Sequence, residues 1–284
     1  MHIATIRLAS SVLFMPTNVT VLLPETPPPA GGKYKVLWLL HWAGADDRTY
    51  LYKVDFEDIL KKHSVMVVMP SAINSDFGHY PAFGRGYDFP KFFFEELMPF
   101  IWDNFAASDR PEDNYMEGAS MGAFGAMSLG LARPERFAAL GMLGASLRES
   151  AFLESYRELG LEQFRRDALA EPKRFPTEYG DPDCGIKPKE VNIITKYPTV
   201  QAFYDSPDCM WYRFQEAAAA GRLPRIYVAC GTEDLFYEAN RRFRDLAEQL
   251  GVQDKVHFNL PEGVDHDEAF FCAEIGRFLD YYQV

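Results

Sequence analysis

The sequence predicts an α/β fold, in which helices flank a central, mostly parallel β-sheet and a cap is inserted. Continuous apolar runs such as "KVLWLLH" and "SVMVVMP" are typical of strands that are buried on both faces. Segments with helical periodicity, such as "YLYKVDFEDILKKH", alternate with these runs along the chain. The chain has 284 residues, of which 48% are hydrophobic, and this is enough for a sizeable core. We therefore expect a single α/β domain over residues 1–284.

The first half of the chain holds the elements near the predicted centre of the sheet. The opening segment "MHIATIRLASSVLFMPTNVTVLLPE" alternates apolar and polar residues, which predicts two strands. After a turn-rich loop come the strand "KVLWLLH", a helix, and the strand "SVMVVMP", which Pro70 closes. The segment "FPKFFFEELMPFIWDNF" predicts a helix with a kink at Pro99. "NYMEG" then predicts a short strand, "SMGAFGAMSLGLA" a helix of small residues, and "RFAALGMLGAS" another strand.

Residues 147–223 interrupt this alternation and are most simply a cap insertion. They hold a helical segment, then Pro-rich and aromatic irregular sequence, then "CMWYRFQEAAAAGR". The cap aromatics either line a substrate pocket, with Trp211 as the candidate for substrate binding, or form an ordinary cap core; they are Phe203, Tyr204, Trp211 and Tyr212. After the cap, the strands "RIYVACG" and "KVHFNLPEG" alternate with two helices, which implies right-handed crossovers in the sheet.

The charge and the cysteines exclude several classes of partner and cofactor. A net charge of -12 argues against nucleic acid or an anionic membrane as the main partner, because both attract basic surfaces. The N-terminus lacks the pattern of a signal peptide and no run is long enough to span a bilayer, so we expect a cytoplasmic protein. The four cysteines show neither metal spacing nor a dense disulfide pattern. We expect no metal and no organic cofactor, and a homo-oligomer is compatible with the sequence.

The motif "GASMG" (118–122) predicts a nucleophile, Ser120, at the turn between a strand and a helix. The turn is sharp and strained, so the neighbours of the serine must be small. It lifts the hydroxyl above the carboxyl edge of the sheet. The backbone N–H of Met121 then lies at a helix start, where it can bind an oxyanion. A Gly/Ala-rich turn without chemistry is the alternative interpretation.

A serine nucleophile needs a base, and the base needs an acid that orients it. In this type of fold the acid and then the base follow the serine along the chain. Two histidines follow Ser120: His257 lies inside a predicted strand, whereas His266 lies in a loop before the last helix, where the base is expected. Asp234, in the loop after "RIYVACG", is the better candidate for the acid than Glu233; a helix N-cap is the alternative role for Asp234.

The second oxyanion donor is expected from the loop after an early central strand. "WLLHWAGADD" is that loop, and the backbone N–H of Ala43 is the leading donor, with that of Trp42 next. His41 precedes the serine, so we expect it to support the loop as a buried, hydrogen-bonded side chain.

With these residues in place, the chain resembles α/β-hydrolases of the esterase D or tributyrin esterase type, which are related to S-formylglutathione hydrolases and to feruloyl and acetyl-xylan esterases. The resemblance extends from "SSVLFMPTNVTVLLP" through "MEGASMGAFGAMSLGLARPERFAALGMLGAS" and "VACGTEDLFYEANRRFRDLAEQLG" to "LPEGVDHDEAFF". It implies Ser120 as nucleophile, Asp234 as acid and His266 as base. Ala43 and Met121 become the oxyanion donors.

The chain departs from the family pattern at two positions near the site. Trp42 stands in "HWAG", where the family usually has glycine, and either narrows the acyl pocket, as a substrate-binding residue, or shifts the loop. Glu117 precedes the motif where a small or apolar residue is usual. Its carboxyl either raises the basicity of His266, disfavours anionic substrates, or points away.

The predicted function is a serine carboxylesterase that hydrolyses short-chain acyl esters of a small molecule through an acyl-enzyme on Ser120. One alternative is a catalytically weak or inactive α/β-hydrolase that acts as a binding or scaffold protein. The others are an acyltransferase and an S-formylglutathione-type thioesterase, for which Arg85 could bind the anionic tripeptide.

Overall fold

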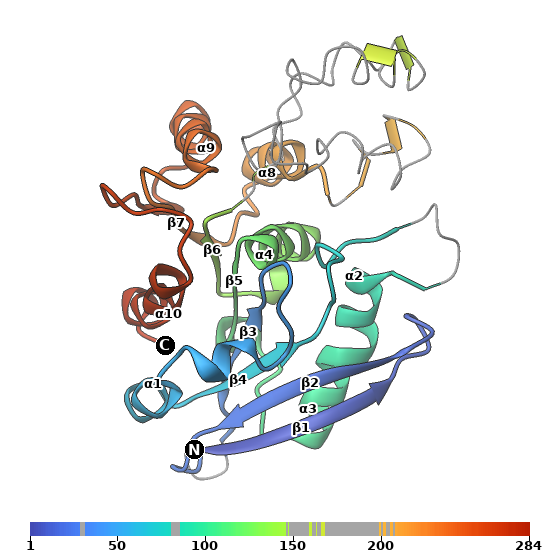
Figure 1. The fold of residues 1–284 in the computed structure, drawn as a ribbon, viewed down its shortest axis with the longest axis vertical. Helices are drawn as coiled ribbons and strands as arrows, with labels where there is room; N and C mark the ends of the chain where they lie inside the picture. The colour runs from blue at the N-terminus through green and yellow to red at the C-terminus, as the bar shows by residue number, and fades with distance from the viewer. Residues whose placement is uncertain are drawn as a thin grey trace.

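The computed structural model describes residues 1–28, 32–80, 86–145, 147, 159–160, 163, 166–167, 199, 201–202, 205–206 and 208–284. Within these residues, eight strands form one sheet in the order β1-β2-β4-β3-β5-β6-β7-β8 (Figure 1). The strands are β1 (His2–Ala9), β2 (Pro16–Leu23), β3 (Lys35–Leu40), β4 (Val65–Pro70), β5 (Asn114–Ala119), β6 (Ala139–Leu143), β7 (Arg225–Ala229) and β8 (Val256–Asn259). β2 pairs antiparallel with β1 and β4, and all other neighbours are parallel. The predicted mostly parallel sheet is confirmed.

Helices cover both faces of this sheet. One face carries α2 (Phe89–Phe92), α3 (Met98–Asn104), α4 (Met121–Ala132), α8 (Met210–Ala219) and α9 (Tyr237–Gln249). The other face carries α1 (Phe56–Lys62) and α10 (Glu268–Tyr282). The molecule therefore has three layers, and the sheet lies between two apolar clusters.

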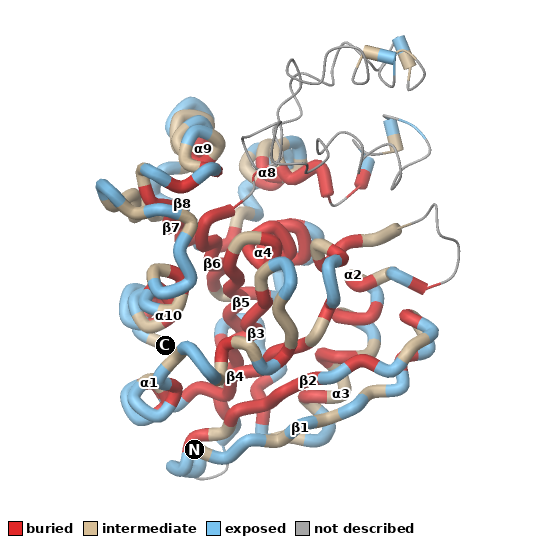
Figure 2. The backbone as a smooth tube through the Cα atoms, in the orientation of Figure 1, coloured by how far each residue is buried: buried red, intermediate tan, exposed pale blue. Residues whose placement is uncertain are grey.

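The central strand β3 shows why the apolar runs are continuous in sequence. Val36, Trp38 and Leu40 enter the cluster under α4, while Leu37 and Leu39 enter the cluster under α10, and all five are 0% exposed. Side chains alternate between the faces of a strand, so a strand with helices on both faces needs apolar residues at every position. Figure 2 shows this as an unbroken buried trace through the centre of the sheet.

The predicted helix over 89–105 is divided into three parts. α2 is followed by a π-helical turn (Phe93–Leu97), and α3 begins at Met98. Pro99 lies in the first turn of α3 and has no N–H for a bond to the preceding turn. The wider π turn accommodates this missing hydrogen bond, so the irregularity that the sequence predicts as a kink lies just before Pro99.

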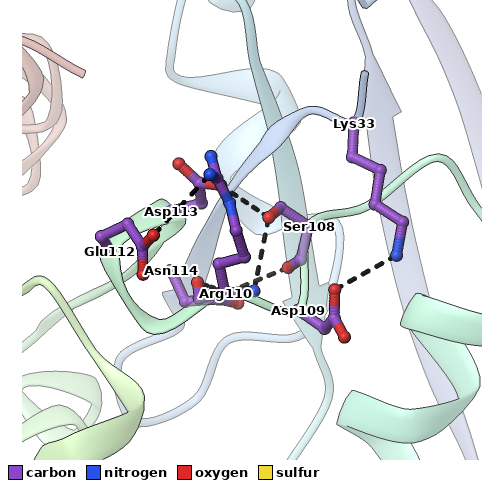
Figure 3. A network of polar contacts seen from close by, with 7 residues as sticks. All are labelled: Lys33, Ser108, Asp109, Arg110, Glu112, Asp113 and Asn114. Carbon is purple, nitrogen blue, oxygen red and sulfur yellow. Dashed lines mark hydrogen bonds and ion pairs between the residues drawn. The ribbon is translucent and has the colours of Figure 1, made fainter. Parts of the chain in front are cut away.

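Polar contacts fix the start of β5, the strand that leads to Ser120 (Figure 3). The side-chain amide of Asn114 donates to the carbonyls of Ser108 and Arg110, at 2.9 and 2.8 Å. The Asp113 carboxylate accepts from Ser108 Oγ at 2.6 Å and pairs with Arg110 at 2.7 Å. The indole N–H of Trp38 on β3 donates to Asn114 Oδ1 at 2.9 Å. This last bond joins two neighbouring strands and supports their register.

The region of the predicted cap lies largely outside the described residues, including Phe203 and Tyr204, and the cap stays a prediction. The described helix at its end, α8, is part of the crossover between β6 and β7. Phe214 of α8 is fully buried, and its ring centroid lies 4.6 Å from that of Phe243 on α9. Among the described residues, no helix has the length and apolar character needed to cross a membrane.

Candidate active site

Ser120 forms a strained turn between the last residue of β5 and the first residue of α4. Its φ is 53° and its ψ is -111°, a backbone conformation that non-glycine residues rarely adopt. Its backbone N–H donates to the carbonyl of Leu143, at the end of the neighbouring strand β6, at 2.7 Å. This hydrogen bond to the sheet therefore stabilises the strained backbone conformation of Ser120.

The small residues of the motif are required by close backbone contacts. A Cβ placed on Gly122 would lie 2.1 Å from the carbonyl oxygen of Leu40, at the end of β3. No side chain fits at that distance, because the first turn of α4 lies directly against the end of the central strand. The spacing of "GASMG" thus reflects the approach of α4 to the sheet.

The structure brings the three predicted polar side chains together. His266 Nε2 lies 3.0 Å from Ser120 Oγ, and His266 Nδ1 lies 2.7 Å from Asp234 Oδ2. A carboxylate only accepts hydrogen bonds, so Nδ1 carries the proton and Nε2 is free to accept one from the serine. Ser120 follows β5, Asp234 follows β7 and His266 follows β8. The site therefore lies at the carboxyl edge of the parallel strands.

Asp234 is buried, and each of its two carboxylate oxygens accepts a hydrogen bond. Its Oδ1 accepts the backbone N–H of Phe236 at 2.7 Å, which leaves Oδ2 for His266. Its side chain is 0% exposed, whereas that of His266 is 21% exposed. The residue at the N-cap of α9 is Phe236, so the alternative N-cap role of Asp234 is wrong. Its carboxylate is positioned to orient the imidazole.

Two aromatic rings fix the plane of the His266 imidazole. Phe236 and Phe271 lie edge-on to it, with ring centroids 5.3 and 4.9 Å away. Asp267 caps α10 by accepting the N–H groups of Ala269 and Phe270. The imidazole is thus held by packing on two sides, while its Nε2 faces the serine.

The two predicted oxyanion donors lie at the start of α4 and in the loop after β3. Met121 is the first residue of α4, and Ala43 belongs to a turn in which the N–H of Ala45 donates to the Trp42 carbonyl at 3.2 Å. Gly44, with φ of 79°, occupies the third position of this turn, as in a type II turn. Within the described chain, the N–H groups of Ala43 and Met121 donate to no protein acceptor. Both are available to a ligand.

The two tryptophans predicted to contact substrate have separate environments. The Trp42 ring lies edge-on to Tyr50, with centroids 4.9 Å apart, and is half-buried in the candidate oxyanion loop (41–45). Trp211, on α8, lies 5.9 Å from the ring of Phe243 on α9. Trp42 packs on the cluster under α10 and precedes a candidate donor in the chain, and Trp211 packs on the cluster under α4. Their substrate-binding roles stay predictions.

Glu117 is fully buried on the face of β5 opposite α4. Its strand neighbours on that face, Tyr115 and Ala119, belong to the cluster under α10, and its side chain covers Gly141 of β6. Neither carboxyl oxygen has a hydrogen-bond partner within the described residues. Burial, together with the charge of Glu274, raises the pKa of Glu117 well above its ordinary value of 4.5. The protonated, neutral form is favoured.

The second histidine after Ser120, His257, and the cysteines lie outside the triad. His257 lies in β8 as expected, and its ring stacks on Tyr281 with centroids 4.2 Å apart. Cys209 and Cys230 are buried, Cys272 is half-buried, and Cys184 lies outside the described residues. Over the described ranges, no group of three His, Cys, Asp or Glu side chains is arranged to hold a metal ion.

Sequence reasoning did not identify Asn74 as part of the site. Its Oδ1 accepts the backbone N–H of Gly44 at 2.7 Å and so links the loop after β4 to the oxyanion loop. The sequence holds no local signal for this contact, because it depends on the pairing of β4 with β3, which brings the loops after both strands to one edge. Phe236 and Phe271 were also missed, because their packing on His266 depends on tertiary structure.

Comparison with known proteins agrees with the geometry. The Esterase family model, described as "Putative esterase", matches residues 10–272. The acetyl esterase of Caldicellulosiruptor saccharolyticus is 25% identical over 290 residues, which cover 99% of this chain and 98% of that protein. A family model that covers so much of the chain identifies the family.

Two solved structures from Staphylococcus aureus share the fold. The fluorophosphonate-binding serine hydrolase F has a TM-score of 0.75 and 22% identity, with 99% of this chain and 98% of that chain covered. The S-formylglutathione hydrolase has a TM-score of 0.73 and 21% identity, with 99% of both chains covered. From the family match and this fold, the chain belongs to the esterase family and is a carboxylic ester hydrolase with an α/β-hydrolase fold.

Proposed function

We propose that this protein is a serine esterase that hydrolyses short-chain acyl esters through a Ser120–His266–Asp234 triad. The observation that carries the proposal is the pair of hydrogen bonds at His266, 3.0 Å to Ser120 Oγ and 2.7 Å to Asp234 Oδ2. This is the arrangement that a nucleophile, its base and an orienting acid require.

The first half of the reaction forms an acyl-enzyme. His266 Nε2 takes the proton of Ser120 as its Oγ attacks the ester carbonyl carbon. The carbonyl oxygen becomes an oxyanion, which the N–H groups of Ala43 and Met121 bind. When the tetrahedral intermediate collapses, the carbon–oxygen bond to the alcohol breaks and His266 gives its proton to the leaving oxygen. Asp234 holds the imidazole tautomer and stabilises the imidazolium.

The second half repeats these steps with water. Nε2 removes a proton from a water molecule, whose oxygen attacks the acyl carbon. The same two N–H groups bind the second oxyanion, and the proton returns to Ser120 Oγ as the carboxylic acid leaves. No step draws on a metal or an organic cofactor, and the substrate is a small ester in aqueous solution.

A short acyl group is proposed from the oxyanion loop. Trp42 precedes the Ala43 donor in the chain, and its ring, edge-on to Tyr50 and packed on the cluster under α10, takes up space that a glycine would leave open. The name of the acetyl esterase relative is consistent with a small acyl group. A thioester of glutathione is a weaker candidate, because a chain with a net charge of -12 disfavours an anionic tripeptide. Arg85, the basic residue considered for it, lies outside the described residues.

The proposal is tested by hydrolysis of p-nitrophenyl acetate, butyrate and octanoate by wild type and Ser120→Ala. We expect saturable turnover that falls with chain length and drops by at least about a thousandfold in the variant. Asp234→Asn, which leaves the buried site filled, should also lose most of its kcat. Equal rates for wild type and Ser120→Ala would contradict the serine mechanism. A preference for octanoate would contradict the short acyl pocket alone.

A further inference from the structure

Two peptide planes meet at Ala43, and both are held by side chains outside the turn. The Trp42–Ala43 peptide carries the Trp42 carbonyl on one side and the Ala43 N–H on the other, because a trans peptide is planar. His41 Nδ1 lies 2.8 Å from that carbonyl oxygen. A contact that holds the carbonyl in one direction therefore aims the Ala43 N–H in the opposite one.

The tautomer of His41 follows from its second contact. The backbone N–H of Ala72 donates to His41 Nε2 at 3.0 Å, so Nε2 is the acceptor nitrogen. The ring proton then lies on Nδ1 and is donated to the Trp42 carbonyl. His41 is 1% exposed, and this burial lowers its pKa below the ordinary value of 6.5, so the ring is neutral near pH 7. A neutral ring with one donor and one acceptor fits both contacts.

The second peptide plane, Ala43–Gly44, is held from the same neighbouring loop. Asn74 Oδ1 accepts the Gly44 N–H at 2.7 Å. Between Ala72 and Asn74, Ile73 has a φ of 48°, and the residue is 50% exposed. A β-branched residue is strained in this conformation, and such strain persists only where the surrounding contacts determine it. The two bonds to the oxyanion loop flank that strained residue.

We propose that His41 and Asn74 are positioning residues that aim the Ala43 N–H at the oxyanion by fixing the two peptide planes on either side of Ala43. The loop after β4 thereby sets the geometry of the oxyanion hole on the loop after β3. A hydrogen bond to the Trp42 carbonyl also polarises that peptide and strengthens its N–H as a donor. This inference rests on the proposed serine mechanism.

Two substitutions of His41 separate its two bonds. The side-chain amide of Asn reaches the position of Nδ1, so His41→Asn keeps a donor for the Trp42 carbonyl and loses the contact with Ala72. The amide of Gln reaches the position of Nε2, so His41→Gln keeps an acceptor for Ala72 and loses the donor to Trp42. Each variant loses one hydrogen bond, so a purely structural role predicts equal effects. Asn74→Ala removes the other bond.

The readouts are kcat and KM for p-nitrophenyl butyrate and the Ki of a short-chain trifluoromethyl ketone, which forms a tetrahedral oxyanion on the serine. For His41→Gln and Asn74→Ala we expect kcat to fall by about tenfold to a hundredfold, KM to change little, and Ki to rise in proportion to the loss of kcat. His41→Asn should stay within about threefold of wild type in both kcat and Ki. Tyr34→Phe, which loses a remote hydrogen bond to the Thr26 carbonyl, is the control for general destabilisation.

Three outcomes would count against the inference. Equal losses in His41→Gln and His41→Asn would assign His41 a structural role. Unchanged Ki in His41→Gln and Asn74→Ala would show that neither residue affects the oxyanion hole. A loss of kcat in Tyr34→Phe as large as that in Asn74→Ala would trace the effect to stability. In each case Ser120-dependent hydrolysis by the wild type persists, whereas its absence would overturn the serine mechanism instead.

Discussion

Glu117 is the residue whose environment departs furthest from its usual one. A carboxyl with 0% exposure and no hydrogen-bond partner in the described chain is stable only in its neutral form. The side chain occupies space that Gly141 leaves beside it on β6. Since Glu117 is buried in the cluster under α10, its charge state is expected to act on folding stability.

The pKa of Glu117 predicts a pH dependence of stability. Because the folded-state pKa is raised above 4.5, the free energy of unfolding is highest below that value and declines as the pH rises toward the folded-state pKa. Glu117→Gln removes this titration. We expect the variant to match wild type at pH 5 and to exceed its free energy of unfolding at pH 8 by roughly 1–3 kcal/mol. Urea unfolding at both pH values measures this; a constant difference between them would contradict it.

At the scale of elements, the connection from β1 to β2 is anchored to the π-helical turn Phe93–Leu97. The Glu96 carboxylate accepts Ser10 Oγ at 2.5 Å, Ser11 N–H at 3.0 Å and Val12 N–H at 3.1 Å. Burial alone raises the pKa of Glu96, but these donors lower it below 4.5 in sum. The antiparallel edge of the sheet is thus tied to the helix layer by one carboxylate.

Loss of this anchor should weaken the edge of the sheet without affecting catalysis. We expect Glu96→Gln to lower the free energy of unfolding by about 1–2 kcal/mol at pH 7 and to speed amide exchange at Ser11 and Val12. The destabilisation should shrink as the pH falls below 4.5 and through the lowered folded-state pKa of Glu96, because wild-type Glu96 then loses its charge. Hydrogen exchange tests the weakening of the sheet edge, and the kcat for p-nitrophenyl butyrate tests that catalysis is unaffected. Faster exchange confined to other strands, or a lower kcat, would contradict the assignment.

At the scale of the whole molecule, a formal charge of -12 acts on charged substrates. An anionic ester is repelled at long range, and dissolved salt screens this repulsion. We expect the ratio of kcat/KM for 4-acetoxybenzoate to that for phenyl acetate to rise severalfold between about 10 mM and 0.5 M salt. A ratio that is independent of salt would show that the overall charge has no influence at the site.

The parts of the molecule that the sequence predicts are those with a local signal. Buried runs predict β3 and β4, and the small residues around Ser120 predict the tight turn, because both requirements appear within a few neighbouring positions. The loop position of His266, against the position of His257 inside a predicted strand, was enough to select His266 as the base. The contacts of Asn74 depend on which strands are neighbours, so they became visible only in three dimensions.

The π-helical turn shows a second limit. Pro99 predicts an irregularity in the helix. Whether the preceding turn is α- or π-helical depends on how its aromatic residues pack against the sheet. Phe93 meets Trp38 edge-on, with ring centroids 5.2 Å apart. No local pattern in the sequence encodes such a contact across 55 positions of chain.

The hydrogen bonds of the triad span 32 residues between Asp234 and His266 and 146 residues between Ser120 and His266. Contacts of this sequence separation close long loops and form slowly during folding. Helices and the strand pair β1–β2 can form earlier from local contacts, before any nucleophile is activated. Recovery of hydrolysis after dilution from denaturant therefore reports completion of the sheet from β5 to β8, and a nascent chain acquires activity only after His266 has been synthesised.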